Sequence, residues 1–129
     1  MEHNLQIGMS HTAEKIVDNT NTASALGSGQ VDVFATPAMI LLMEEAARHA
    51  VQPTLPVGAT TVGTIVNIQH LAATPTGMKV KATATLKEIS GRRLVFDVEA
   101  HDEKSIIGKG THERAIIDIA RFMAKINPI

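Results

Sequence analysis

Three polar side chains stand in apolar or strand-like surroundings, and together they could support acyl-transfer chemistry. Thr36 precedes a predicted helix, Glu44 lies within it, and His70 lies on a strand that follows. A hydroxyl can act as a nucleophile, a carboxylate can act as a base or orient water, and an imidazole can carry protons. If the fold brings these groups together, they suffice for hydrolysis of an activated acyl group.

Two of these side chains also have purely structural interpretations. A threonine at a helix start most often caps a free backbone amide, although a hydroxyl there is also close to amides that favour a developing oxyanion. On a regular strand, His70 shares a face with Val62, Val66 and Ile68, which predicts apolar surroundings. A lone histidine in that setting is usually a hydrogen-bonded core residue.

The adjacent carboxylates Glu44 and Glu45 need not share a role, because successive residues lie about 100° apart around a helix. Glu45 is placed to pair with Arg48 or His49 on the solvent side. Glu44 lies where the apolar and polar faces meet, so its carboxylate is expected to be partly desolvated and usable as a base.

One long helix is predicted from Pro37 to about Val51. Thr36-Pro37 is a favourable helix start, and Gln52-Pro53 ends the helix because the residue before proline disfavours helical geometry. Its apolar side chains recur at helical spacing: Met39, Ile40, Met43, Ala46, Ala47, Ala50 and Val51. The preceding stretch, 18–30, is rich in Asn, Thr, Ser and Gly, which predicts a loop or flap.

Strand patterns follow the helix. Alternating apolar and polar residues over 78–86 and 94–100, joined by a turn at 90–92, predict an antiparallel hairpin. Further strands are expected at about 60–71 and 106–117. One helix followed by antiparallel strands predicts an α+β protein in which a long central helix is wrapped by a curved sheet, as in a hot-dog fold. The same pattern permits other helix-on-sheet folds, such as a cone-shaped barrel with one helix.

Length and composition favour a single domain, 1–129, with a small-molecule partner. A formal charge of −1 and only three aromatic residues, all Phe, argue against nucleic acid. The chain shows neither a signal segment nor about 20 consecutive apolar residues, so no membrane association is expected. The lack of cysteine excludes disulfides and a thiolate nucleophile and fits the reducing cytoplasm.

No metal site is predicted from the remaining histidines, because none is paired with acidic neighbours at ligand spacing. They are His3, His11, His49, His101 and His112. Lys79, Lys81 and Lys87 form a basic strand face, most simply a solvated one, with attraction to coenzyme A phosphates as the alternative.

An ordered set of segments closely resembles the fluoroacetyl-CoA thioesterase family over about 31–125. These segments are Val33-Phe34-Ala35-Thr36, Leu42-Met43-Glu44, Val62-Gly63-Thr64, His70-Leu71-Ala72-Ala73-Thr74-Pro75, Gly91-Arg92-Arg93-Leu94, Ala100-His101-Asp102 and Gly108-Lys109-Gly110-Thr111-His112-Glu113-Arg114-Ala115.

The resemblance implies a hot-dog fold, a homodimer or a tetramer of paired dimers, and hydrolysis of an acyl-CoA thioester without a cofactor. Carried over by position, Thr36, Glu44 and His70 match the catalytic trio, while Gly63 and Arg114 match positions that line or support the substrate site. Thr36 and Glu44 would attack the carbonyl directly or through water, and His70 would transfer protons.

The flap departs from the family pattern. Members specialised for the fluorinated substrate carry aromatic lid residues, whereas 18–30 contains none. A different short acyl-CoA is therefore the expected substrate. The alternatives are a non-catalytic protein that binds acyl-CoA or another small ligand on the same scaffold, because fold does not fix function, and a hydratase acting on an enoyl thioester.

Overall fold

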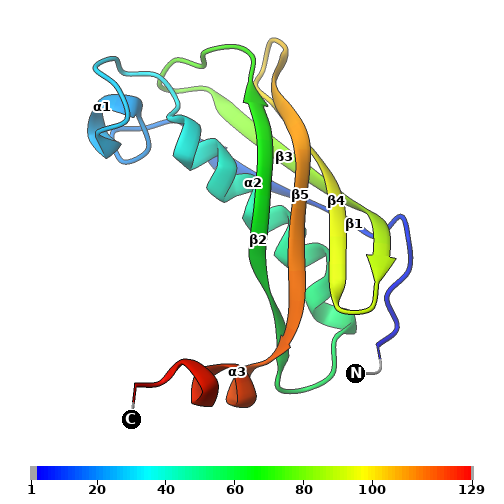
Figure 1. Ribbon diagram of the computed structural model, residues 1–129. Helices are drawn as coiled ribbons and strands as arrows, with labels where there is room; N and C mark the ends of the chain where they lie inside the picture. The colour runs from blue at the N-terminus through cyan, green and yellow to red at the C-terminus, as the bar shows by residue number, and fades with distance from the viewer. Residues whose placement is uncertain (1–2, 129) are drawn as a thin grey trace.

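The computed structural model describes residues 3–128, in which one long helix lies against a curved antiparallel sheet (Figure 1). The five strands are β1 (Ser10–Ile16), β2 (Ala59–His70), β3 (Lys79–Ser90), β4 (Arg93–His101) and β5 (Ile106–Asp118). Their order across the sheet is β1-β3-β4-β5-β2, so β1 and β2 form its edges. The central helix is α2 (Thr36–Val51), which packs mainly across β1 and β3.

Helix α2 begins one residue earlier than its sequence signals predict. Ala35 occupies the N-cap position and makes no side-chain cap hydrogen bond, while Thr36 is the first helical residue. The expectation that the Thr36 hydroxyl caps the helix is therefore wrong. The helix ends at Val51 as predicted, and the 3-10 turn η1 (Gln52–Thr54) follows it.

The hairpin of β3 and β4 confirms the alternating pattern. Val80 and Leu86 are fully buried against α2, whereas Lys79 and Lys81 lie on the outer face and form ion pairs with Glu14 of β1. Gly91 has φ +62°, a value that a two-residue hairpin turn requires and that glycine adopts without strain.

Strand β2 contains a bulge that changes which residues face the helix. On β5, Arg114 pairs with Gly63 and the preceding residue Glu113 pairs with Ile65. Thr64 is therefore an extra residue without a partner of its own. Since opposite residues share a sheet face, Gly63 faces α2 with Arg114, and after the bulge Val66 faces it with His112. The predicted common face of His70, Val66 and Ile68 is confirmed, but Val62 lies on the other face.

Three elements were not predicted from the sequence. Strand β1 precedes the flap, the short helix α1 (Ala23–Leu26) lies within it, and α3 (Ile119–Ile126) follows β5. Asp118 caps α3 by accepting a hydrogen bond from the Arg121 amide, although α3 buries none of its residues fully. Across residues 3–128, no helix is long and apolar enough to span a bilayer.

Candidate active site

The start of α2 and the end of β2 bring Thr36 and His70 into direct contact. The Thr36 Oγ1 atom lies 2.7 Å from Nδ1 of His70, which is hydrogen-bond distance. Because this hydroxyl is not used as a helix cap, it can donate a proton to the imidazole when Nδ1 is unprotonated. The pair that the sequence singled out from residues 34 positions apart is thus assembled within one chain.

A cleft of about 360 Å³ opens beside this pair. Its walls come from the flap, from the residues just before α2 and from the segment after β2: Ala23, Ser28, Val33, Phe34, Leu71, Ala72 and Ala73. Phe34 is buried and connects the cleft to the core. The cleft therefore offers a short apolar group access to the Thr36 hydroxyl.

Burial lowers the pKa of His70, against a smaller opposing effect of the nearby Ala72 backbone. The imidazole is consequently neutral near pH 7 and able to accept a proton. Its second nitrogen, Nε2, is buried and has no hydrogen-bond partner among residues 3–128. A buried nitrogen without a hydrogen-bond partner costs about 1–3 kcal/mol of stability, so Nε2 of His70 is a polar atom that the folded chain leaves unpaired.

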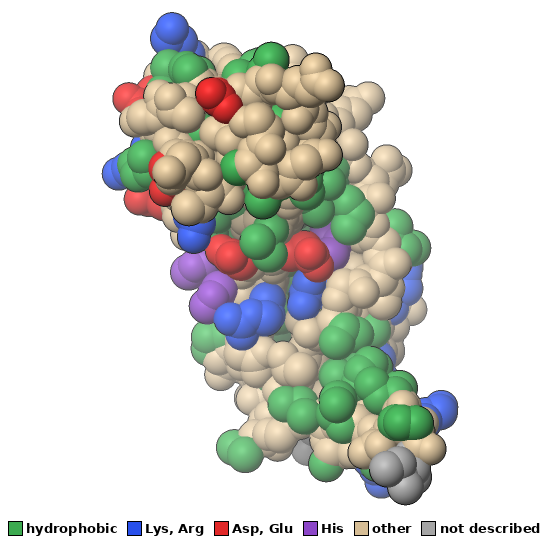
Figure 2. Space-filling view, turned by 90° about the vertical axis from the view of Figure 1, so that its left-hand side faces the viewer, with side chains coloured by type: hydrophobic (Ala, Val, Ile, Leu, Met, Phe, Trp, Pro, Cys, Tyr) green, Lys and Arg blue, Asp and Glu red, His purple; other side chains and the backbone are tan. Residues whose placement is uncertain are grey.

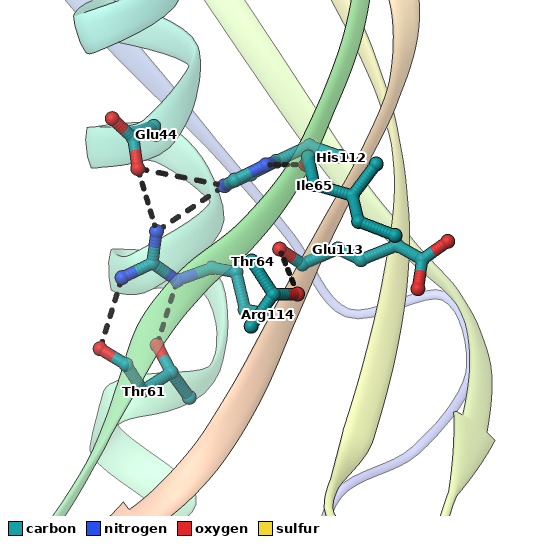
Figure 3. A network of polar contacts seen from close by, with 7 residues as sticks. All are labelled: Glu44, Thr61, Thr64, Ile65, His112, Glu113 and Arg114. Atoms are coloured by element: carbon teal, nitrogen blue, oxygen red, sulfur yellow. Dashed lines mark hydrogen bonds and ion pairs between the residues drawn. The ribbon is translucent and has the colours of Figure 1, made fainter.

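Glu44 belongs to a second cluster, halfway along α2 (Figure 3). Its Oε2 atom accepts a hydrogen bond from Nη1 of Arg114 at 3.2 Å. Arg114 is buried and is held from the other side by Thr61, whose hydroxyl accepts from Nε at 2.8 Å and whose carbonyl accepts from Nη2 at 2.9 Å. The Glu44 side chain remains 37% exposed, so one edge of the carboxylate faces outward.

His112 completes this cluster, and the sequence analysis missed it. Its Nδ1 lies 2.7 Å from the carbonyl oxygen of Ile65, and its Nε2 lies 3.2 Å from Nη1 of Arg114. A carbonyl only accepts and a guanidinium only donates, so Nδ1 carries the proton and Nε2 is the acceptor. Burial is the main cause that lowers the pKa of His112, so its 3.9 Å contact with Glu44 is not an ion pair.

Gly63 makes room for the carboxylate. A Cβ atom at this position would lie 2.6 Å from Glu44 Oε2 and 3.2 Å from Cε1 of His112. Any side chain would therefore displace Glu44 or its partners. The structure places Gly63 and Arg114 beside Glu44, and neither is beside the Thr36–His70 pair.

The predicted trio is divided between two places within one chain. Thr36 and Glu44 are eight residues apart on α2, which corresponds to about 12 Å along the helix axis at 1.5 Å per residue. One chain therefore unites Thr36 with His70 but leaves Glu44 with Arg114, His112 and Gly63.

The other histidines form no metal cluster. Among residues 3–128, no three His, Asp or Glu side chains converge as a metal ion would require. His11 of β1 instead stacks on His49 of α2 with ring centroids 5.2 Å apart, and His49 lies 3.1 Å from a nitrogen of Arg48.

Comparison with known proteins relates the whole arrangement to thioesterases. A family model described as fluoroacetyl-CoA-specific thioesterase matches residues 17–120. A fluoroacetyl-CoA thioesterase of Streptantibioticus cattleyicolor is 47% identical over 95 residues, which is 74% of this chain and 68% of that protein. A solved structure of the fluoroacetyl-CoA thioesterase has a TM-score of 0.88 and 39% identity, covering 95% of this chain and 96% of that one. A thioesterase-superfamily member from Thermus thermophilus has a TM-score of 0.87 and 31% identity over 95% and 90% of the two chains. The hot-dog fold expected from the sequence is confirmed.

Proposed function

The chain belongs to the fluoroacetyl-CoA-specific thioesterase family and is a thioester hydrolase, and we propose that it hydrolyses a short-chain acyl-CoA ester with Thr36, Glu44 and His70. The observation that carries this assignment is the Thr36–His70 hydrogen bond beside a cleft lined mainly by apolar side chains. Coenzyme A enters as part of the substrate, and hydrolysis needs no other cofactor. A cytoplasmic location is part of the proposal and accords with the absence of cysteine.

Thr36 and His70 act at the thioester carbonyl. Neutral His70 accepts the proton of the Thr36 hydroxyl, or of a water in its place, as the nucleophile attacks. No side chain caps the start of α2, so the first-turn N–H groups of Thr36 and Ala38 are free of a side-chain acceptor and can stabilise the developing oxyanion, whereas Pro37 has no N–H group. The imidazole then supplies a proton to the leaving thiolate.

Glu44 orients or deprotonates the hydrolytic water. Within residues 3–128, the contacts of this carboxylate with Arg114 and His112 all involve Oε2. Oε1 is left to accept a hydrogen bond from water. Arg114 and Gly63 support this geometry, the first by holding one oxygen and the second by leaving space for it.

A homodimer would complete the site. Strand β2 is an edge strand whose residues 64–67 are exposed, and exposed apolar side chains include Ile65 and Val66. If two copies of β2 paired antiparallel about a two-fold axis near these residues, Gly63 would lie opposite the last residues of the partner strand. Glu44 of one subunit would then approach the Thr36–His70 pair of the other.

The side of the molecule that is on the left in Figure 1 supports this arrangement. Figure 2 shows acidic, basic and histidine side chains gathered in the middle of this face, with hydrophobic side chains above and below. The exposed apolar residues Val57, Ile119, Met123 and Ile126 add surface that a partner could cover. We expect a dimer in solution, or a tetramer built from two such dimers.

The acyl group is expected to be short and not specifically fluorinated. The residues from Asp18 to Gln30 include no aromatic side chain, and α1 contributes Ala23 to the cleft wall. The flap therefore contributes small side chains that leave space for an acyl group, and the one aromatic ring in the cleft wall, Phe34, lies outside the flap and is almost completely buried. We therefore propose that fluoroacetyl-CoA is at best one of several substrates.

Thiol release from a panel of short, branched, aromatic and fluorinated acyl-CoA esters tests the proposal. Glu44→Ala and His70→Ala should each lower kcat by about 10²–10⁴-fold, the usual contribution of a general acid or base. Glu45→Ala, at a half-buried position like that of Glu44, and His101→Ala, at an exposed position, are the controls and should leave kcat within about twofold. Near-normal turnover in folded Glu44→Ala and His70→Ala proteins would contradict the assigned site.

A further inference from the structure

His112 is fully buried beneath the Glu44–Arg114 pair, and both of its ring nitrogens are used. The Nδ1–H group donates to the carbonyl of Ile65 at 2.7 Å, which fixes the ring on the main chain next to the Thr64 bulge. The Nε2 lone pair is thereby directed at Nη1 of Arg114, 3.2 Å away. The ring is 1% exposed, so water does not compete for either bond.

Arg114 Nη1 has two hydrogens, and the structure gives each of them an acceptor. One is Nε2 of His112 and the other is Oε2 of Glu44, both at 3.2 Å. Thr61 occupies Nε and Nη2 on the opposite edge of the guanidinium. The plane of the guanidinium is therefore set from two sides, and the direction of Nη1 toward Glu44 depends on His112.

We propose that His112 is a positioning residue of the hydrolytic reaction, which acts through Arg114 to hold the Glu44 carboxylate with Oε2 occupied and Oε1 turned toward the substrate water. This inference rests on the proposed function of Glu44. His112 touches no reacting atom. It serves as a neutral acceptor in a place where a protonated imidazole would repel the guanidinium.

Two substitutions at His112 distinguish its hydrogen bond to Ile65 from its hydrogen bond to Arg114. In His112→Gln, the amide oxygen can replace Nε2 as acceptor for Arg114, although the donor to Ile65 is lost. In His112→Asn, the amide nitrogen can replace Nδ1 as donor to Ile65, but nothing reaches Arg114. If His112 acts only on folding, these two variants should lose kcat equally or His112→Asn should be the more active.

The positioning role predicts a different pattern. His112→Asn should lower kcat by about 10–30-fold, the value of one lost positioning hydrogen bond, with KM within about threefold of wild type. His112→Gln should retain kcat within about threefold. In a Glu44→Ala background, His112→Asn should cause no further loss, because the carboxylate that it positions is gone.

Nuclear magnetic resonance of the guanidinium N–H groups gives a second readout that needs no turnover. The Arg114 side-chain N–H signals should exchange slowly with water in wild type and His112→Gln, and at least tenfold faster in folded His112→Asn. If wild type released no thiol from any ester, the proposed function would fail, while this exchange series would still decide whether His112 holds Arg114. Equal kcat losses in the two variants, or unchanged exchange in His112→Asn, would overturn the inference.

Discussion

Gly63→Ala is the substitution whose effect can be worked out most directly from the structure. The added Cβ would lie 2.6 Å from Glu44 Oε2, and about 0.8 Å of movement is needed to restore the 3.4 Å of ordinary contact. The backbone itself can accept alanine, because Gly63 is not among the glycines with positive φ. A shift of this size moves the carboxylate away from Arg114, and misplacement of a reacting group by about 1 Å costs on the order of 10²-fold in rate. We expect kcat to fall by about 30–100-fold, which corresponds to about 2–3 kcal/mol of transition-state stabilisation.

A double-mutant cycle shows whether the loss passes through Glu44. Thiol release is measured for wild type, Gly63→Ala, Glu44→Ala and the double variant, and thermal unfolding confirms that each protein is folded. If the methyl group acts by displacing the carboxylate, it should cost less than about twofold when Glu44 is already alanine. Full multiplication of the two single effects would refute the reasoning, as would wild-type kcat in Gly63→Ala.

Two further predictions concern stability. Burial lowers the pKa of His70 and of His112, so both stay neutral when folded while the unfolded chain takes up protons below about pH 6.5. The contribution of these histidines to the free energy of unfolding, measured by urea unfolding, should therefore be highest above pH 6.5 and decrease as the pH falls toward 5. A contribution that increased on acidification would contradict this prediction. Gly110→Ala should destabilise the protein by several kcal/mol or prevent folding, because its Cβ would collide with the backbone oxygen of Asn67 across β2 and β5. A thermal midpoint of Gly110→Ala within about 2 °C of wild type would contradict this prediction, because it would mean that β2 and β5 move apart to admit the methyl group without loss of stability.

Periodicity was sufficient to predict the elements that bury a regular apolar face. The helix through Met39 and Met43 and the strand through Val80 and Leu86 were predicted because each repeats its apolar residues at a single period. Helix α3 and strand β1 were not predicted. Strand β1 is exposed at every position except Ala13, so it shows no alternation between core and solvent. Helix α3 does carry apolar residues at helical spacing, Ile119, Phe122, Met123 and Ile126, so its periodicity was an available signal although it buries none of them fully.

The site was predictable in its chemistry but only partly in its geometry. The hydroxyl of Thr36 and the imidazole of His70 were recognised from their surroundings, yet the contact between them depends on how the chain returns after 34 residues. The prediction that Val62 and His70 share a sheet face was wrong because of the bulge at Thr64. One extra residue in a strand moves all residues on one side of it to the opposite face of the sheet. His112 was dismissed for lack of metal-ligand spacing. Its position two residues before Arg114 on the same strand was the available signal, because alternate residues share a face.

The unassisted start of α2 has a consequence for efforts to make the protein more heat-resistant. Ala35 is a poor N-cap with a fully buried methyl group, and a serine in its place, which adds a single oxygen atom, would be expected to stabilise the helix by about 1 kcal/mol. A library screened only for thermal tolerance would therefore enrich such variants. The new hydroxyl would accept a hydrogen bond from the Ala38 amide, because Pro37 has no N–H group, and that amide is proposed to receive the oxyanion. The most heat-resistant clones should therefore include some of the least active. Selection for robustness and selection for turnover thus act in opposite directions at this one residue.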